Sequence, residues 1–266
     1  MSHELMVNDL SVRYGNAIAV DGLNLRVDSQ QMTGLVGPNG AGKSSALLAI
    51  YGSIATNATV TLDGDDVARM SPRDRARRIA LVPQGRQLFP KMTVRENLRV
   101  MSEFLKLPTN AVGEAMDRFP ILHDRANAYA GVLSGGEQQM LVVTRALMAN
   151  PQVLLLDEMM TGLAPRIVQE LSATVRELAD SGVAVLTADP SITPVRRIID
   201  RGYVLLRGRV VSEADNLTDL DRQYQRAMGI IHREVEDAEA IVDQAIASDR
   251  PVDYEAISEH ETQEPR

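Results

Sequence analysis

An eight-residue motif near the N-terminus limits the fold and the chemistry of this chain more than any other feature. After an apolar run at residues 33–37, the pattern G-x-x-x-x-G-K-[S/T] is matched by Gly37, Pro38, Asn39, Gly40, Ala41, Gly42, Lys43 and Ser44. Residues 44–51 then favour a helix, so the motif joins a strand to a helix. Such a loop turns backbone N–H groups toward phosphate oxygens, and the helix N-terminus adds positive potential. The sequence therefore predicts a nucleotide site, with Lys43 on the β- and γ-phosphates and Ser44 on Mg²⁺.

The alternative is a tight strand-to-helix turn that contains a lysine by chance, and the flanking strand and helix disfavour it.

The 266 residues allow between one and two domains, and 44% apolar with 24% charged residues is typical of a soluble globular chain. This composition excludes a disordered chain, a fibrous chain and a coiled coil. We expect neither a membrane span, which needs about 18 apolar residues, nor a secretion signal. The chain has no cysteine, which excludes disulfides and thiolate metal sites and fits a cytosolic location.

The net charge of −8 is confined to the end of the chain. Residues 230–266 hold 11 acidic and 3 basic side chains, whereas residues 1–229 hold 25 of each. Binding to nucleic-acid phosphates needs an excess of Lys and Arg, so we expect no nucleic-acid partner.

A second motif places two acids at the end of an apolar run. Residues 153–156 favour a buried strand, and Asp157 and Glu158 follow directly. Ligands of open α/β sheets bind at the carboxyl ends of the strands. If this strand neighbours the phosphate-loop strand, Asp157 faces the Mg²⁺, and Glu158 polarises a water for attack on the γ-phosphate. Two surface acids at a solvated strand end are the alternative.

A third motif precedes an apolar helix and consists of Ser134, Gly135, Gly136 and Glu137. Ser134 with Glu137 three residues later forms a capping box, which alone explains these residues. Two consecutive glycines before a helix also make an anion-binding terminus. Two such sites on different faces of one protein indicate that two chains sandwich a nucleotide.

Strands that alternate with helices predict an α/β fold with a mainly parallel core sheet. Strands are expected at residues 79–82, 153–156 and 183–186, and antiparallel pairs around turns at Gly15 and Gly64. Residues 93–150 favour helices, which we expect to form an inserted subdomain between two halves of the sheet. The chain then divides into a core (residues 1–92 and 151–229), this helical subdomain, and an acidic C-terminal helix with a loose tail (residues 230–266).

Together the motifs resemble those of the ATP-binding cassette (ABC) ATPases. The phosphate loop, Gln84 after an apolar strand, the run at residues 133–138 and the acidic pair occur in the family's order, over residues 5–211. The resemblance implies an ABC-type P-loop nucleotide-binding domain with an inserted α-helical subdomain, which hydrolyses ATP with Mg²⁺. Residues 82–90, 92–98, 134–141 and 162–165 are similar to the ATP-binding subunits of branched-chain amino acid and urea importers.

The resemblance also implies roles for individual residues. Tyr14 would stack on adenine, although packing against a turn is the alternative. Ser45 would join residues 37–44 around the phosphates. Gln84 would contact Mg²⁺ or the attacking water and report the state of the permease, unless it is only a polar residue at a strand end. Asp157 would help to hold Mg²⁺, and Glu158 would act as the base.

The third motif would act across a dimer. Ser134, Gly135 and Gly136, with Glu137, would contact the γ-phosphate held by the opposite subunit. Leu88, Phe89 and Met92 are either core of the subdomain or an exposed patch for a permease helix.

The family implies partners that the chain itself does not contain. These are transmembrane permease subunits, a second ABC ATPase subunit and, indirectly, a solute-binding protein. The subfamily favours a heterodimer over a homodimer. We therefore expect a cytoplasmic protein held at the inner face of the membrane by the permease. A regulatory cassette that binds ATP without hydrolysing it, and a soluble ABC ATPase outside transport, are the alternatives.

The chain departs from the family pattern in one consequential place. A histidine that senses the γ-phosphate normally follows the strand after the acidic pair, but here Pro190 or, with a gap, Ala188 holds that position. Neither side chain donates a hydrogen bond or carries a proton. Met159 and Ala164 also replace the usual proline and aspartate. We therefore predict that the site formed by this chain's own phosphate loop hydrolyses ATP weakly.

Overall fold

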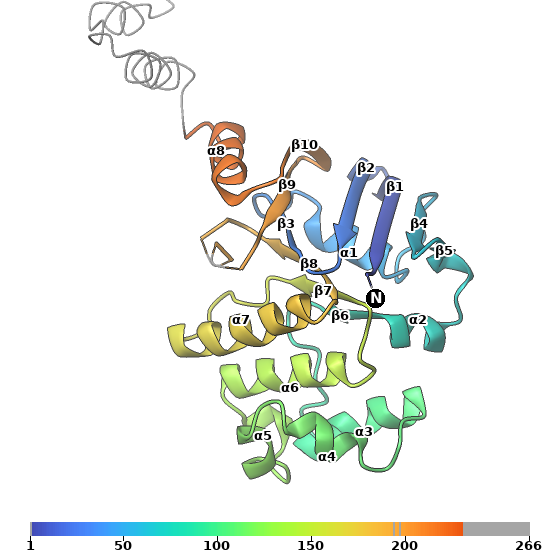
Figure 1. The fold of residues 1–266 in the computed structure, drawn as a ribbon, viewed down its shortest axis with the longest axis vertical. Coiled ribbons are helices and arrows are strands. Elements are labelled where there is room, and N and C mark those ends of the chain that lie inside the picture. Colours follow the sequence, from blue (N-terminus) through green and yellow to red (C-terminus); the bar gives the residue numbers. More distant parts are fainter. Residues whose placement is uncertain (1, 194, 197, 231–266) are drawn as a thin grey trace, which may run out of the picture.

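The computed structural model describes residues 2–193, 195–196 and 198–230, and the expected C-terminal helix after residue 230 lies outside them. The chain forms two β-sheets with helices on both sides of the larger one (Figure 1). The smaller sheet is antiparallel, in the order β2-β1-β4-β5. Its strands are β1 (Glu4–Tyr14), β2 (Ala17–Asp28), β4 (Thr59–Leu62) and β5 (Asp65–Asp66). The antiparallel pairs expected around Gly15 and Gly64 are thus confirmed.

The larger sheet has six strands in the order β10-β9-β3-β8-β7-β6. In chain order, its first five strands are β3 (Met32–Val36), β6 (Ile79–Val82), β7 (Val153–Asp157), β8 (Ala184–Asp189) and β9 (Arg201–Leu206). These five run parallel, and β10 (Arg209–Ala214) closes the sheet antiparallel to β9. Strands β3, β7 and β8 are buried throughout, as parallel strands covered on both faces must be. The α/β fold class is confirmed. Because the five strands are parallel, their carboxyl ends all lie along the same border of the sheet, which is here called the sheet edge.

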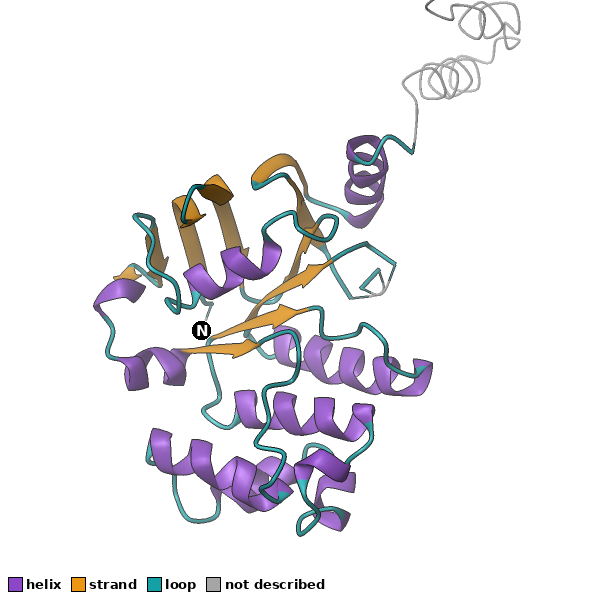
Figure 2. Ribbon diagram, turned by 180° about the vertical axis from the view of Figure 1, so that it is seen from behind, coloured by secondary structure: helices purple, strands orange, loops and turns teal. Residues whose placement is uncertain are grey.

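Each face of this sheet packs on its own apolar core. Helix α1 (Lys43–Ile50) lies between the two sheets and buries Leu47 and Ile50 against both. Helices α6 (Gly135–Leu147) and α7 (Pro165–Asp180) cover the opposite face, as Figure 2 shows from behind. Helix α8 (Leu217–Ala227) adds Leu220 to the same core.

The helical insert leaves the sheet after β6 and returns at β7. It contains α3 (Val94–Leu105), α4 (Ala111–Met116), α5 (Ile121–Asp124), the short turn η2 (Ala130–Val132) and α6. Because β6 and β7 are neighbours at one end of the sheet, the insert that joins them does not separate two halves of the sheet. Its last helix, α6, packs on one face, and α3, α4 and α5 pack on α6 (Figure 1). The two remaining short helices, η1 (Val67–Arg69) and α2 (Pro72–Arg78), precede β6. Among the described residues, no helix is both long enough and apolar enough to cross a membrane.

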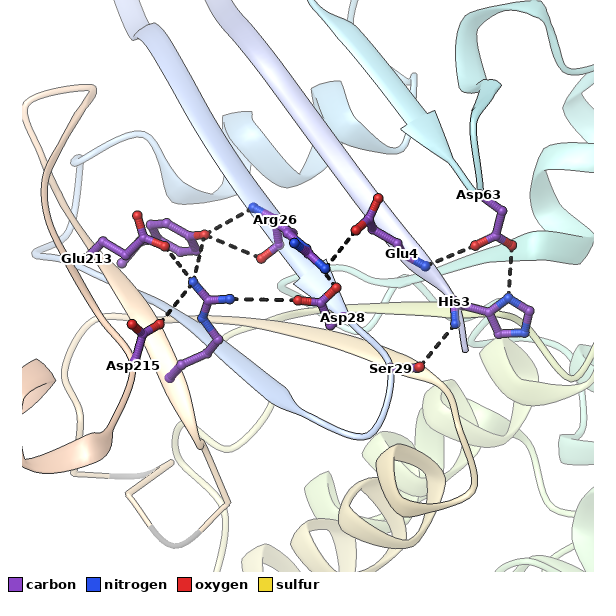
Figure 3. Close-up of polar contacts among 10 residues, drawn as sticks. His3, Glu4, Arg26, Asp28, Ser29, Asp63, Glu213 and Asp215 are labelled. Atoms are coloured by element: carbon purple, nitrogen blue, oxygen red, sulfur yellow. Dashed lines mark hydrogen bonds and ion pairs between the residues drawn. The ribbon is translucent and has the colours of Figure 1, made fainter. Parts of the chain in front are cut away.

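A surface network of ion pairs fastens the small sheet to the large one (Figure 3). Arg26 on β2 lies 2.8 Å from carboxylate oxygens of both Glu4 and Asp28. Arg201 on β9 pairs with Glu213 and reaches Asp28 at 3.8 Å. Exposed pairs of this kind contribute little one by one, but a connected set fixes the angle between the sheets.

The loop between β6 and α3 is held by one buried amide. Asn97 Nδ2 donates to the carbonyl oxygens of Phe89, Met92 and Thr93, at 3.1, 3.2 and 2.9 Å. Asn97 Oδ1 accepts from the N–H of Phe89 at 2.9 Å. Asn97 itself is fully buried, so its amide depends on these backbone groups for its hydrogen bonds.

We expect Asn97→Ala to lower the free energy of unfolding by about 1–3 kcal/mol, because the N–H of Phe89 loses its acceptor and three carbonyl oxygens each lose one of their two donors. Urea unfolding followed by circular dichroism measures the loss. Asn110→Ala is the matched control, since Asn110 is exposed and bonds only Glu114 in its own helix turn. Equal stabilities for the two variants would contradict this role for Asn97.

Candidate nucleotide-binding and hydrolytic site

Two glycines let the phosphate loop pass close to neighbouring backbone. Gly42, which directly precedes α1, has φ of 107°, and a Cβ there would lie 2.2 Å from Ala19 O. A Cβ on Gly37 would lie 2.1 Å from Leu205 O. Neither distance is possible for a real side chain, so only glycine fits at these two positions. Gly40 also has a positive φ, of 79°, but a Cβ there would meet nothing within 4 Å.

Lys43 is the buried cation of the site. Its Nζ donates to Gly37 O at 2.8 Å and Pro38 O at 3.2 Å, and it lies 3.9 Å from Glu158 Oε1. Burial lowers the pKa of Lys43, and the nearby carboxylates Glu158, Asp157 and Asp189 oppose this shift. The loop therefore wraps around a positive charge at the N-terminus of α1, which is the arrangement that anionic phosphates need.

Ser44 and Asp157 meet although their strands are not neighbours. The role expected for Asp157 is conditional on adjacent β3 and β7, but β8 lies between them. Helix α1 nevertheless contacts β7 across β8, and Ser44 Oγ donates to Asp157 Oδ1 at 3.1 Å. Burial raises the pKa of Asp157, and the hydrogen bond from Ser44 opposes that shift.

Glu158 and Gln84 form the next contact along the same sheet edge. Gln84 follows β6, and its Nε2 donates to Glu158 Oε2 at 2.9 Å. Glu158 has φ of 49° and its N–H donates to Ala188 O at 2.9 Å, so the backbone turns sharply where β7 ends. The acidic pair is therefore part of a connected polar cluster and not a solvated strand end.

The oxygen donors in this cluster fit Mg²⁺. Ser44 Oγ and Asp157 Oδ1 already face each other, and Gln84 adds an amide. No group of three or more His, Asp or Glu side chains within the described residues could hold a metal. Mg²⁺ in phosphoryl-transfer sites is held by one or two protein oxygens together with substrate phosphates and water, so this small donor set suits it.

The third motif forms the capping box that its sequence allows. Ser134 Oγ accepts from the N–H of Glu137, and the Glu137 side chain accepts from the N–H of Ser134 at 2.7 Å. This backbone bond lowers the pKa of Glu137, and Arg125 adds to the effect. Throughout the described ranges, no hydrogen bond or ion pair joins residues 134–137 to the phosphate loop. Binding of these residues to a nucleotide on an opposite subunit stays a prediction.

The adenine position also stays a prediction. Tyr14 ends β1 with 52% of its side chain exposed, and its hydroxyl lies 3.4 Å from Ser45 Oγ. Beyond Gln84, Leu88 packs against the core and Phe89 is 45% exposed, so this loop contributes to both core and surface.

A cavity of about 380 Å³ lies between the acidic pair and the helical insert. It is lined by the loop after β6, by the start of α6 and by the end of β7. Arg86 crosses it and donates to Gln138 Oε1 at 3.0 Å. The hydrolytic cluster is therefore open toward the insert.

Sequence reasoning missed one acid at this edge. Between Ala188 and Pro190, the two candidates for the missing histidine, stands Asp189, the last residue of β8. It is fully buried, and burial raises its pKa to about 6. Like Asp157 and Glu158, Asp189 is an acid at the carboxyl end of an apolar strand. The same pattern in the sequence would therefore have identified it.

Comparison with known proteins agrees with this geometry. The family described as ABC transporter matches residues 20–161, which span the phosphate loop, the third motif and the acidic pair. This chain belongs to the ABC transporter family. It is therefore an ATP-binding ATPase subunit of a transporter, as the resemblance of its motifs implied.

Individual relatives within the ABC family differ in what they transport. The high-affinity branched-chain amino acid transport ATP-binding protein BraG of Pseudomonas aeruginosa is 36% identical, over 78% of this chain and 91% of BraG. The lipopolysaccharide export system ATP-binding protein LptB of Haemophilus influenzae is 31% identical, over 78% of this chain and 89% of LptB. The crystal structure of MJ1267, an ABC transporter cassette in its ADP conformation, superposes with a TM-score of 0.72 at 26% identity, covering 83% of this chain and 95% of MJ1267.

We expect Gly42→Ala to abolish nucleotide binding, because its Cβ would collide with Ala19 O and displace the N-terminus of α1. Gly40→Ala is the matched control: it also adds one methyl group at a positive φ, but into open space. We expect it to weaken binding by less than about tenfold, for a strain of roughly 1 kcal/mol. Titration with a fluorescent ATP analogue measures both. Equal losses would show that the collision is not what matters.

Proposed function

We propose that this chain is the ATP-hydrolysing subunit of an importer for branched-chain amino acids or a related small polar solute such as urea. The observation that carries the hydrolytic part is the connected cluster of Lys43, Ser44, Asp157, Glu158 and Gln84 at one sheet edge. The identity to BraG, a branched-chain amino acid transport ATP-binding protein, supports the class of solute. Import as the direction of transport is supported by the resemblance of the motifs to those of importers.

The cluster supplies each part that attack of water on a γ-phosphate requires. Backbone N–H groups within residues 37–45 would bind the phosphate tail, except at Pro38, which has none, and at Gly37 and Ala41, whose N–H groups donate to Asp189 O and Pro38 O. Lys43 Nζ would neutralise charge on the β- and γ-phosphates. Glu158 accepts the proton of the attacking water as its oxygen bonds to phosphorus and the bond to ADP breaks. Gln84, already bonded to Glu158, orients that carboxylate and the water.

Ser44 and Asp157, with Gln84, would hold Mg²⁺, which when bound supplies charge neutralisation at the phosphate oxygens. Tyr14 would stack on adenine next to Ser45, since its exposed ring stands beside the start of α1. Stacking without hydrogen bonds would distinguish ATP poorly from GTP.

We also propose that the working unit is a pair of cassettes on a membrane permease. Ser134, Gly135, Gly136 and Glu137 stand at the N-terminus of α6, and among the described residues no hydrogen bond joins them to the phosphate loop of their own chain. A helix N-terminus with two glycines suits a γ-phosphate held by the opposite subunit. The second cassette is a different chain in the favoured assembly and a second copy in the alternative. The permease would hold the protein at the cytoplasmic face of the membrane and would receive solute from a binding protein.

A second candidate function is a regulatory cassette that binds ATP but hydrolyses it slowly. It is favoured by the end of β8, where Ala188 is buried within the strand and Pro190 offers no donor. Loss of one contact to the transition state costs about 3 kcal/mol, or about 10²-fold in rate. In this case the faster site is the one to which this chain contributes Ser134 and its glycines.

We expect Glu158→Gln to lower the rate of ATP hydrolysis by about 10²-fold or more while ATP binding is retained, because the amide cannot accept the proton of water. Phosphate release by the assembled transporter measures the rate. Glu170→Gln, on the exposed face of α7, is the matched control and should leave the rate unchanged. An unchanged rate in Glu158→Gln together with intact transport would support the regulatory role.

We expect the chain to copurify with membrane subunits when it is expressed with its natural neighbours. Vesicles that contain this complex should take up radiolabelled leucine or urea only when ATP is present on the cassette side. ATP-driven movement of solute away from the cassette side of the membrane would contradict the proposed direction of transport. Transport of an amphiphilic substrate in place of leucine or urea would contradict the proposed class of solute.

A further inference from the structure

The side chain of Gln84 is not held in place by burial. Gln84 is exposed, although its Nε2 donates to Glu158 Oε2 at 2.9 Å. An exposed side chain with one hydrogen bond keeps its direction only if the backbone that carries it is fixed. The position of Gln84 against Glu158 therefore depends on the loop that follows β6.

That loop has a backbone conformation that its residues do not favour by themselves. Gly85, Arg86 and Gln87 follow one another with φ of 84°, 65° and 43°. Left-handed backbone suits glycine, but it is unfavourable for arginine and glutamine, which carry a Cβ. Such residues persist in this region only where the surrounding structure holds them. The support for the loop must therefore come from contacts with other elements.

Two arginine side chains connect the loop to α6. Arg86 Nη1 donates to Gln138 Oε1 at 3.0 Å. Arg145, near the end of α6, donates from Nη1 to Gln87 O at 3.0 Å. Both left-handed residues that carry a Cβ are thus held by the same helix.

The acceptor of Arg86 is itself fixed. Gln138 Nε2 donates to Ala130 O at 3.1 Å and to Leu133 O at 3.2 Å, which leaves the amide oxygen directed at Arg86. A Cβ on Gly135 would lie 3.0 Å from Arg86 Nη2, so the guanidinium lies directly against the first turn of α6.

The stability of α6 does not explain why Arg86 lies there. The N-terminal end of a helix carries partial positive charge, so a guanidinium beside it is unfavourable for the helix. Within the described residues, no ion pair with a carboxylate offsets the charge of Arg86. The contact is better explained by what it does for the loop and for Gln84.

We propose that Arg86 is a positioning residue, which ties the loop after β6 to Gln138 so that Gln84 stays directed at Glu158. This inference rests on the proposed hydrolytic function and adds a residue that acts on it through Gln84. Arg86 itself contacts neither the nucleotide nor the attacking water. The contacts run from α6 through Arg86 and Gln84 to Glu158, so the helix that begins with the third motif also fixes the geometry of the hydrolytic cluster.

This role predicts an effect on kcat and not on KM. Without Arg86 the loop loses one of its two contacts with α6, and Gln84 no longer orients Glu158 and the water. Binding of ATP to the phosphate loop is unaffected, because no hydrogen bond within the described ranges joins Arg86 to residues 37–45.

ATP hydrolysis by the assembled transporter tests the inference. We expect Arg86→Ala to lower kcat by about tenfold and to change KM for ATP by less than about twofold, since misplacement of a catalytic group slows the chemical step without weakening substrate binding. Arg86→Lys can still donate to Gln138 and should retain most of the wild-type kcat. Equally low rates in both variants would overturn the inference.

Arg73→Ala is the matched control. Arg73 also joins the core to the helical insert, because its Nε donates to Phe104 O at 2.8 Å, but it stands on α2, before β6. This variant should leave kcat unchanged. A fall as large as that of Arg86→Ala would show that any loosened contact with the insert slows hydrolysis, and the specific role of Arg86 would be wrong.

A double variant distinguishes a positioning role from a general structural role. Because Arg86 acts through Gln84, Arg86→Ala should cause no further loss of kcat in a Gln84→Ala background. Losses that multiply in the double variant would contradict this. So would a KM that rises while kcat stays the same, since Arg86 would then bind nucleotide.

Glu158→Gln in the same assay checks the function on which the inference rests. A normal rate in Glu158→Gln would overturn the proposed hydrolytic role of the cluster. Loss of hydrolysis in Glu158→Gln together with a normal rate in Arg86→Ala would overturn only the role of Arg86.

Discussion

The buried positive charge of Lys43 is the interaction on which the whole site depends. Three carbonyl or carboxylate groups from the loop and from β7 surround its Nζ within 4 Å. A buried ammonium is stable only with such partners, so the loop, β7 and the start of α1 must hold their relative positions. The order of the large sheet provides this, since β3, β8 and β7 are neighbours and end at the same edge. Ser44, Asp157 and Glu158 come together as a result.

The local features of the site could be predicted from the sequence, because each depends on residues close together in the chain. The strand at residues 79–82 is confirmed as β6, and the Ser134–Glu137 capping box forms with both of its hydrogen bonds. The phosphate loop joins β3 to α1 as its pattern requires. In each case the pattern specifies a backbone geometry by itself.

Features that depend on the order of strands could not be predicted in this way. An apolar run predicts a buried strand but does not predict its neighbours in the sheet. The position of β8 between β3 and β7 could therefore not be predicted. The expectation that the insert separates two halves of the sheet failed for the same reason, because β6 and β7 are neighbours. Asp189 could have been identified as an acid at the end of an apolar strand, but its burial beside Gly37 and Glu158 could not, because both are distant in sequence.

The small antiparallel sheet limits how far the chain of such a cassette can be shortened. The carbonyl of Ala19 on β2 lies against Gly42, and the N–H of Gly208, in the turn before β10, donates to Ala41 O at 2.9 Å. The loop that surrounds Lys43 is thus in contact with two outer segments, and neither segment provides a residue of the proposed catalytic cluster. A fragment cut back to the parallel strands and α1 would retain every residue of the motif, yet its loop would lose both of these contacts. A shortened cassette therefore has to keep β2 and the turn before β10, because these segments support the phosphate loop.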